Sequence, residues 1–304
     1  MPEICVLLPA LNAASTIEAA VYSTLRALPA HSQILLLDDG STDGTAQVAA
    51  QGADKAGRSA DLVVIRNEKP GGVANGLNQL LSHADSRFIG RMDADDISLR
   101  GRFRACIKAL NNGDDFVFTQ IIRTRGRLYK PNAPLPLDPP FFPYELLLSN
   151  PATHPAMLAT REAFDRLGGY RVTPAEDYDL WLRAATEKMR LRRLPHWGLL
   201  YRIHPGQVTQ GADYLATSHT DSRQAQAYSD LALALVGTPL VRPALLPTVD
   251  PAERSRAITT FATVLTEHFA HLPGFQGFLL RRHLRSKIAS MSSLDTVTKE
   301  SGKE

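Results

Sequence analysis

Cysteine is scarce in this sequence, and long apolar segments are missing. Two cysteines, Cys5 and Cys106, occur among 304 residues, which is too few for a disulfide framework. Cys5 lies inside the apolar run of residues 4–8 and is expected to be buried as a small hydrophobic side chain. No stretch approaches the roughly 18 apolar residues of a membrane span, and no basic leader precedes the first apolar run. We therefore expect a cytoplasmic protein that is at most peripheral at the inner face of the cell membrane.

An excess of charge of one sign is also missing. The formal net charge is only +3 at pH 7, whereas nucleic-acid binding usually requires a concentrated basic face. We therefore expect no nucleic-acid partner. Neither Gly-x-Gly-x-x-Gly nor Gly-x-x-x-x-Gly-Lys-Ser/Thr follows any predicted strand, which disfavours the two commonest nucleotide-binding loops.

The first hundred residues alternate short apolar runs with segments of helical periodicity. The apolar runs occupy residues 4–8, 34–37, 62–65 and 88–92, and the helical segments between them cover residues 15–28, 43–51 and 73–83. This alternation predicts an α/β fold with a mostly parallel sheet and crossover helices. Ligands bind beyond the carboxyl ends of parallel strands, so the polar loops that follow the four runs form the candidate site.

Local signals predict where several elements begin and end. Ser15 and Glu18 have the spacing of a capping box, and Pro29 and Gly52 are predicted to stop the first two helices. Further along, we expect a helix over 102–110, an extended segment over 116–128, and a helical region from residue 221 with a break at 239–251.

Three carboxylates crowd the end of the fourth apolar run, in Arg91-Met92-Asp93-Ala94-Asp95-Asp96. In extended backbone, residues two apart point to the same side, so Asp93 and Asp95 can converge on one ligand. Without a counter-ion they would repel each other, and Mg²⁺ or Mn²⁺ with oxygen ligands would neutralise them. A solvated acidic turn is the alternative, but the position after a parallel strand favours a metal site.

Asp39 lies in a polar turn, residues 38–45, that follows the second apolar run and opens a helix. Its carboxylate can accept a hydrogen bond from a base imide or a ribose hydroxyl. A well-capped turn with no ligand is an equally good interpretation of this segment.

Asp177 and Asp179 begin an amphipathic helix, where residues two apart diverge by about 200° and should not share a metal. A lone carboxylate facing a cleft can act as a general base, although acids in a first turn also simply complement the helix dipole. His204, in Tyr201-Arg202-Ile203-His204, is a candidate metal or phosphate ligand, although a lone histidine is more often structural.

Taken in order, these segments resemble glycosyltransferase family 2, the inverting enzymes with the GT-A fold. The resemblance spans residues 3–210 and runs through residues 7–12, 38–41, 71–78, 91–96, 150–155, 168–170, 176–177 and 201–204. It implies a GT-A catalytic domain over 1–215, with a nucleotide-binding half (1–110) and an acceptor half (111–215). A helical C-terminal extension would follow over 216–304.

The resemblance also implies roles for individual residues. The donor would be a nucleotide-diphosphate sugar, with UDP as the expected nucleotide, and its binding residues would be Pro9, Ala10, Asn12, Asp39, Asn75, Arg91 and Asp93. Among these, the segment around Pro9 together with Asp39 would hold the base, and Asp93 would approach the ribose. Asp95 and His204 would ligate Mn²⁺ or Mg²⁺ at the diphosphate. Asp177 matches the family's catalytic base.

The implied enzyme is a hexosyltransferase that builds a cell-surface polysaccharide or another glycoconjugate. A single in-line displacement would invert the anomeric configuration, and the acceptor would be a glycan, a lipid-linked sugar or another glycoconjugate. Two alternatives stay open. One is transfer to a polyprenyl phosphate, which is already ionised and needs no strong base, and the other is a catalytically silent scaffold that binds sugar nucleotides.

The C-terminal region lies outside the resemblance and combines an apolar helical face with basic residues. The apolar positions are Leu280, Leu284, Ile288 and Met291. The basic positions around them are Arg281, Arg282, Arg285 and Lys287. This pattern suits peripheral contact with an anionic membrane surface or a lipid-linked acceptor. Packing of the helix on the catalytic domain, or on a second copy in a homo-oligomer, is the alternative.

Overall fold

A computed structural model of the chain describes residues 2–204, 217 and 220–300. It divides into two compact units. The first, here called the sheet unit, comprises Met1–Pro136, Ala152–Val172 and Met189–Gln207. The second, here called the helical unit, comprises Leu137–Pro151, Thr173–Lys188 and Val208–Glu304. Residues 137–151 and 173–188 thus group with the later helices, and the predicted boundary between residues 215 and 216 lies outside the described residues.

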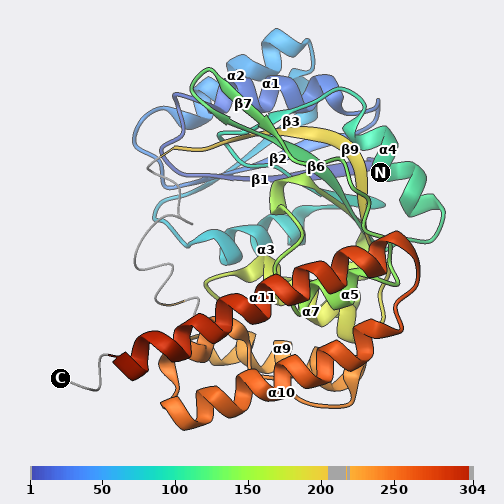
Figure 1. Cartoon of the computed structure of the whole chain (residues 1–304). Coiled ribbons are helices and arrows are strands. Elements are labelled where there is room, and N and C mark those ends of the chain that lie inside the picture. The colour runs from blue at the N-terminus through green and yellow to red at the C-terminus, as the bar shows by residue number, and fades with distance from the viewer. Residues whose placement is uncertain (1, 205–216, 218–219, 301–304) are drawn as a thin grey trace. The chain divides into compact units, whose positions relative to one another are not determined.

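Within the described residues, the sheet unit contains one nine-stranded mixed sheet (Figure 1). Its order is β3-β2-β1-β4-β8-β6-β9-β5, and β7 pairs with β6. Four neighbouring strands run parallel to one another, namely β1 (Ile4–Ala10), β2 (Gln33–Asp39), β3 (Leu62–Asn67) and β4 (Phe88–Arg91). The remaining strands are β5 (Ile97–Ser98), β6 (Phe116–Arg125), β7 (Leu128–Pro131), β8 (Met157–Thr160) and β9 (Leu191–Arg202). The predicted GT-A-like sheet, mostly parallel and flanked by helices, is confirmed.

Both faces of β1, β2 and β4 are covered. On one face, Ile4, Val6 and Leu8 belong to a core shared with α1 (Ile17–Ala27), α2 (Thr45–Ala56) and α4 (Arg102–Asn111). The alternate residues Cys5 and Leu7 are also fully buried, on the face where α3 (Val73–His83) contacts β1 and β2. Burial on both faces explains the apolar runs of β1, β2 and β4, whereas the edge strand β3 leaves Val63 and Val64 exposed. The short helices of this unit are η1 (Ser59–Asp61), η2 (His154–Ala156) and α6 (Arg161–Leu167).

Helix α2 runs straight through Gly52, its predicted end. A β-carbon at Gly52 would lie 2.6 Å from the carbonyl oxygen of Glu18 in α1. Glycine is therefore needed here for close packing between two helices. The helix ends instead at Gly57, which adopts the left-handed conformation at φ 67°.

One other local prediction is wrong, and two strands were not predicted. The N-cap of α1 is Thr16 and carries no side-chain cap hydrogen bond, so the capping box at Ser15 is wrong. Strands β8 and β9 were not predicted, because β8 is only four residues long and β9 carries Arg192, Arg193 and Pro195 where an apolar run would be expected. Both strands are positioned by their partners β4 and β6 and not by their own composition.

The helical unit contains α5 (Phe142–Leu146), α7 (Glu176–Thr186), α9 (Ser222–Val236), η4 (Pro243–Thr248), α10 (Pro251–Ala270) and α11 (Gly274–Glu300). Buried tyrosines tie its helices to the 146–147 turn: the Tyr178 hydroxyl donates to the Leu146 carbonyl at 2.6 Å, and the Tyr228 hydroxyl to that of Leu147 at 2.7 Å. The predicted C-terminal helical region is confirmed. Among the described residues, no helix combines the length and the apolar character that crossing a bilayer requires.

The α1–α2 contact predicts the effect of a single substitution. Gly52→Val should lower the free energy of unfolding by roughly 1–3 kcal/mol, because the added carbons must displace the backbone of α1. Gln51→Val, at an exposed position of the same helix, reports the intrinsic cost of valine in a helix. Urea unfolding of both variants checks this, and equal stability of the two would show that the contact is not tight.

Candidate active site

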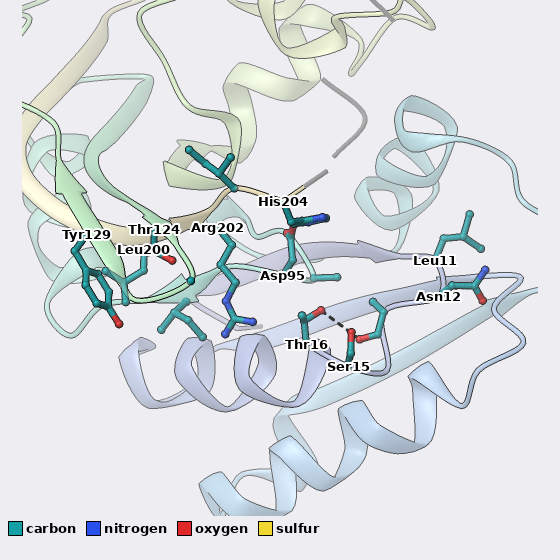
Figure 2. A pocket seen from close by; sticks show the side chains of 15 residues that line it. Leu11, Asn12, Ser15, Thr16, Asp95, Thr124, Tyr129, Leu200, Arg202 and His204 are labelled. Carbon is teal, nitrogen blue, oxygen red and sulfur yellow. Dashed lines mark hydrogen bonds and ion pairs between the residues drawn. The ribbon is translucent and has the colours of Figure 1, made fainter. Parts of the chain in front are cut away.

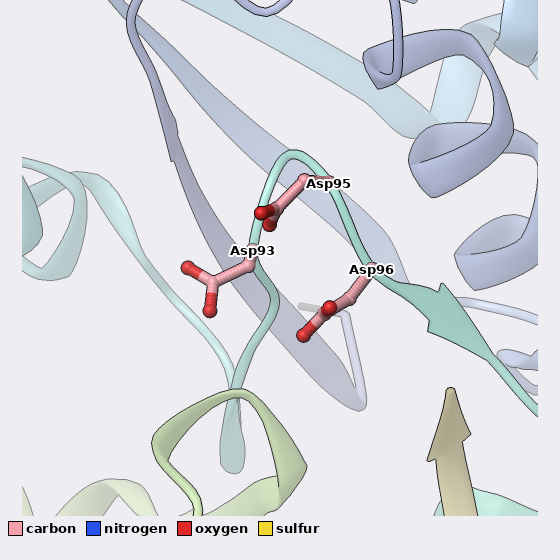
Figure 3. A group of neighbouring side chains, drawn as sticks. All are labelled: Asp93, Asp95 and Asp96. Carbon is pink, nitrogen blue, oxygen red and sulfur yellow. The ribbon is translucent and has the colours of Figure 1, made fainter. Parts of the chain in front are cut away.

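The acid loop, residues 92–96, connects β4 to β5 and brings three carboxylates together (Figure 3). One oxygen from each of Asp93, Asp95 and Asp96 lies within 4.8 Å of the others. Strand β4 ends at Arg91, so the loop turns at Ala94 and Asp95 instead of continuing as extended backbone. The predicted convergence of Asp93 and Asp95 is therefore found, but a turn produces it and not the alternation of a strand.

Asp96, which the sequence pattern does not single out as a site residue, is the buried member of this group. Its Oδ1 accepts a hydrogen bond from the Arg202 backbone N–H at 2.9 Å, and its buried Oδ2 has no hydrogen-bond partner within the described part of the chain. Burial raises the pKa of Asp96 well above its usual range, and the charges of Asp93 and Asp95 raise it further. Burial and the same carboxylates raise the pKa of Tyr201 to about 12.

The two outer carboxylates have cationic or polar neighbours on different sides. Asp93 pairs with the buried guanidinium of Arg91. Asp95 Oδ2 lies 2.8 Å from Nε2 of His204, which follows the end of β9. Pairing of β5 with β9, in which Ile97 lies opposite Leu200, brings the two segments together although they are more than a hundred residues apart. Asp95 and His204, selected separately from the sequence, are thus direct neighbours.

A fully buried arginine holds both ends of the acid loop. Arg102, at the start of α4, donates from Nη2 to the Arg91 carbonyl at 2.7 Å and from Nη1 to the Ser98 hydroxyl at 2.9 Å. It also donates to the Pro155 carbonyl before β8. Burial lowers the pKa of Arg102 to about 10, so the guanidinium still carries its charge at neutral pH. The sequence around Arg102 does not predict this role, because all these contacts form only in the folded chain.

A cavity of about 820 Å³ opens beside the acid loop within the sheet unit (Figure 2). Asp95, Arg202 and His204 form part of its wall, and Leu11, Asn12 and Thr16 contribute from the segment that leads into α1. The remaining lining residues are Ala13, Ser15, Ala94, Ile97, Thr124, Gly126, Tyr129, Leu200 and Ile203. The space is large enough for a small-molecule ligand, and its lining mixes apolar and polar groups as such sites do.

Asn12 connects the loop after β1 to the loop after β2. It adopts φ 51°, its backbone N–H donates to the Ser41 hydroxyl at 2.9 Å, and its side-chain oxygen accepts from the Thr42 N–H at 3.0 Å. Asp38 completes the turn by accepting from the Ser41 N–H at 2.9 Å. The polar turn of residues 38–45 therefore has a clear structural role in joining two strand ends.

Asp39 holds the loop that leads into α3. Its carboxylate accepts from the backbone N–H groups of Gly71 and Gly72 at 2.9–3.1 Å and from the Asn67 amide at 2.8 Å. Asn75, in the first turn of α3, donates back to the Gly71 carbonyl at 2.9 Å. Two of the predicted donor-binding residues, Asp39 and Asn75, thus stabilise the same glycine-containing loop.

Pro9 and Ala10 form the end of β1, in register with Leu37 and Asp38 of β2. Pro9 is half-buried and Ala10 is buried. A β-carbon added at Gly76 of α3 would lie 2.8 Å from Leu37 and 4.0 Å from Pro9. Glycine at position 76 therefore lets α3 lie close to the carboxyl ends of β1 and β2.

Asp177 lies in the helical unit, in the first turn of α7. Its half-buried carboxylate accepts from the side-chain amide of Asn150 at 3.1 Å and from the Tyr178 backbone N–H at 2.7 Å. Asp179 is fully buried and pairs with Arg183 at 2.8 Å. The two acids have different partners, as expected from their divergence on a helix, and Asp179 is occupied by a structural ion pair.

The acid loop has the chemistry of a divalent-cation site. Three carboxylates offer hard oxygen ligands at close range, and a histidine adds a nitrogen. The buried Oδ2 of Asp96 has no hydrogen-bond partner in the described part of the protein, so this oxygen is free to accept a further ligand. These residues fit Mn²⁺ or Mg²⁺.

A model of glycosyl transferase family 2 matches residues 5–166, more than half of the chain and most of the sheet unit. The chain belongs to this family. The match confirms the predicted family, and with it the predicted class of enzyme, a glycosyltransferase.

Relatives in family 2 cover different shares of the chain. EpsE of Bacillus subtilis, named a putative glycosyltransferase, is 29% identical over 200 residues, which are 62% of this chain and 69% of EpsE. WfgD of Escherichia coli, named a UDP-Glc:alpha-D-GlcNAc-diphosphoundecaprenol beta-1,3-glucosyltransferase, is 27% identical over 59% of this chain and 68% of its own length. ExoU of Rhizobium meliloti, a succinoglycan biosynthesis protein, is 38% identical over 119 residues, and the chain spans only about a third of its length.

Solved structures share the fold at low sequence identity. TarS 1–349 of S. aureus, crystallised with UDP-GlcNAc, aligns with a TM-score of 0.62 and 16% identity over 98% of this chain and 92% of that one. The mannosyltransferase PcManGT of Pyrobaculum calidifontis, in complex with GDP-Man and Mn²⁺, aligns with a TM-score of 0.57 and 16% identity over 97% and 87%. Both support the assignment of the fold.

Arg102 should be essential for holding the acid loop of this family 2 member in place. Arg102→Lys should lower the free energy of unfolding by roughly 3 kcal/mol, because an ammonium cannot reach the carbonyls that the guanidinium bridges and hydrogen bonds of charged groups contribute about 1.5–3 kcal/mol each. Arg104→Lys, at an exposed position of the same helix, should change stability by less than about 0.5 kcal/mol. Thermal and urea unfolding measure both, and an Arg102→Lys variant as stable as the unmodified protein would contradict the bridging role.

Proposed function

We propose that this protein is an inverting glycosyltransferase that moves a hexosyl group from a UDP-sugar to a hydroxyl of a glycan or glycoconjugate acceptor. The observation that carries the proposal is the acid loop, in which three converging carboxylates and His204 gather at the carboxyl end of the parallel strands. Family membership supports it independently. Relatives named for polysaccharide and lipid-linked glycan synthesis support a role in building cell-surface glycans.

The donor site in this proposal is built on the ends of β1, β2 and β4. Pro9, Ala10 and Asn12 border the base, and Asp39 fixes the Gly71–Gly72 loop beside it through three of its hydrogen bonds. The other proposed donor contacts are Asn75, Arg91 and Asp93, with Asp93 oriented towards the ribose by its ion pair. The UDP-GlcNAc complex of TarS supports a uridine nucleotide as the first donor to test.

Asp95 and His204 are the proposed metal ligands, and Asp96 stands beside them as a third candidate. A divalent cation bound there would supply positive charge to the diphosphate as it leaves. The protein contributes the position of these ligands: Arg102 fixes the loop ends, and the Arg202 N–H holds the Asp96 carboxylate. The Mn²⁺ of the PcManGT complex supports manganese as the ion to test first.

Asp177 is the proposed general base. Its carboxylate would take the proton of the acceptor hydroxyl while that oxygen forms a bond to the anomeric carbon and the bond from this carbon to the diphosphate oxygen breaks. The nucleoside diphosphate leaves with the bonding electrons, and the configuration inverts because attack and departure occur on opposite faces. The Asn150 amide orients the carboxylate by donating a hydrogen bond to Oδ2.

The metal assignment is tested by removing one ligand. Asp95→Ala should weaken Mn²⁺-dependent UDP binding by roughly 100-fold or more, because the remaining carboxylates cannot close the site. Asp85→Ala removes an exposed carboxylate just before β4 and serves as the control. Isothermal titration calorimetry with UDP, with and without Mn²⁺, measures the effect. Unchanged metal-dependent binding by the Asp95→Ala variant would refute the assignment.

The base assignment is tested by neutralising Asp177. Asp177→Asn should lower kcat by about 10²–10⁴-fold while the KM for the donor changes little, since general-base catalysis contributes on that scale. Glu176→Gln, which removes the adjacent acid of the same helical turn, should keep turnover close to that of the wild type. Near-normal turnover of the Asp177→Asn variant would instead favour an acceptor that is already ionised, such as a polyprenyl phosphate. Binding of a nucleotide sugar by the unmodified protein without turnover of any donor would favour a silent scaffold.

A further inference from the structure

The apolar face of α11 suits either a membrane surface or packing against protein, and in the structure it is buried. Leu280, Leu284 and Met291 are each at most 3% exposed, and α11 packs along α10 in the helical unit (Figure 1). The alternative of helix packing within the protein is therefore correct for these residues, and they are not available to lipid.

A different face of α11 is exposed and contains two phenylalanines. Phe275 is 61% exposed and Phe278 is 52% exposed, and their rings stack on each other with centroids 6.5 Å apart. Exposing two large aromatic side chains side by side is unfavourable in water, and such patches usually mark an interaction surface.

Two arginines continue the same face. With about 100° per residue, Phe275, Phe278, Arg282 and Arg285 fall within an arc of about 80°, roughly opposite to Leu280 and Leu284. Arg282 and Arg285 are exposed, as are Ser286 and Ala289 further along. We call this strip, from Phe275 to Ala289, the α11 outer face. It extends for about 20 Å along the helix.

Arg281 and Lys287, the other two basic residues that the sequence pattern singles out, are used inside the protein. Arg281 donates from Nη1 to the Leu272 carbonyl at 2.7 Å and to the Phe269 carbonyl at 3.1 Å, which satisfies the end of α10. Lys287 is half-buried, and burial lowers its pKa. Only Arg282 and Arg285, of the four basic residues singled out in this helix, therefore present their charge on the outer face.

We infer that the α11 outer face binds the surface of an anionic lipid bilayer, with the helix lying in the plane of the interface. The phenylalanine pair would enter the boundary between headgroups and acyl chains, and the arginines would contact lipid phosphates. Charge supports this occupant over a protein partner, because the outer face presents the exposed Arg282 and Arg285, and residues 274–293 contain no aspartate or glutamate. The inference does not depend on the donor, the acceptor or the activity of the acid loop.

The full-length protein is tested for flotation with vesicles of phosphatidylcholine alone and with vesicles made of equal parts phosphatidylcholine and phosphatidylglycerol. Each arginine near an anionic surface contributes about fivefold to partitioning, so the mixed vesicles should be favoured roughly 25-fold. Raising the salt concentration should weaken this preference, because screening shortens the range of the attraction.

Two double variants test the face itself. Arg282→Glu with Arg285→Glu should abolish the preference for anionic vesicles, and Phe275→Ser with Phe278→Ser should reduce partitioning at least about tenfold. Arg104→Glu with Lys108→Glu makes the same change of charge at exposed positions of α4 and should leave partitioning unchanged. Circular dichroism and thermal unfolding confirm that each variant is folded.

Three results would overturn the inference. The first is equally weak binding of the unmodified protein to both kinds of vesicle, and the second is retained binding in the α11 variants. The third combines two observations: the unmodified protein binds no vesicles, and the α11 variants change the molecular mass of the protein in solution, measured by light scattering. That result would make the outer face a contact between copies of the chain. Donor binding, measured in parallel by calorimetry, stays informative about the acid loop in every case.

Discussion

The repulsion among Asp93, Asp95 and Asp96 is the constraint on which the rest of the sheet unit depends. Three carboxylates within 4.8 Å of one another would separate if the backbone were free to move. The chain opposes this from inside: Arg102 bridges the two ends of the loop, and Arg202 donates its backbone N–H to the buried Asp96. The charge that remains is directed to the outer oxygens, where a cation can bind. The loop therefore holds three carboxylates at a distance at which a bound cation would relieve their repulsion.

In the neighbouring loops, residues of the same type that are close in sequence have different roles. Asp38 and Asp39 are adjacent, but Asp38 closes its own turn at Ser41, whereas Asp39 reaches Gly71 and Gly72 more than thirty residues away. Asp177 and Asp179 also differ in their contacts. Asp179 is buried in an ion pair with Arg183, so its carboxylate is not available to a ligand. A carboxylate's function thus follows from what its oxygens already contact.

Several features of the fold were open to prediction because they depend on local pattern. The apolar runs predict β1 to β4, and in β1, β2 and β4 they arise because strands covered on both faces favour apolar residues at successive positions. Strands β8 and β9 escape prediction because their residues fit partners already present in the sheet. The prediction of a helix end at Gly52 is wrong because glycine permits both a stop and a close helix contact, and only the position of the Glu18 carbonyl distinguishes them. The C-terminal helix is amphipathic as predicted, but its apolar side packs inward.

The sequence by itself determined the family, the mostly parallel sheet and the run of acids after β4, because each of these depends on short segments of contiguous residues. The tertiary structure decided which residues complete the site. Contacts between residues far apart in the sequence determine the roles of Asp96 and Arg102 and the pairing of His204 with Asp95. A local sequence pattern carries no information about such contacts. The tertiary structure also decided which side of α11 faces outward. Helical periodicity shows that the helix has two different faces, but only its packing in the folded protein determines which face is exposed to solvent.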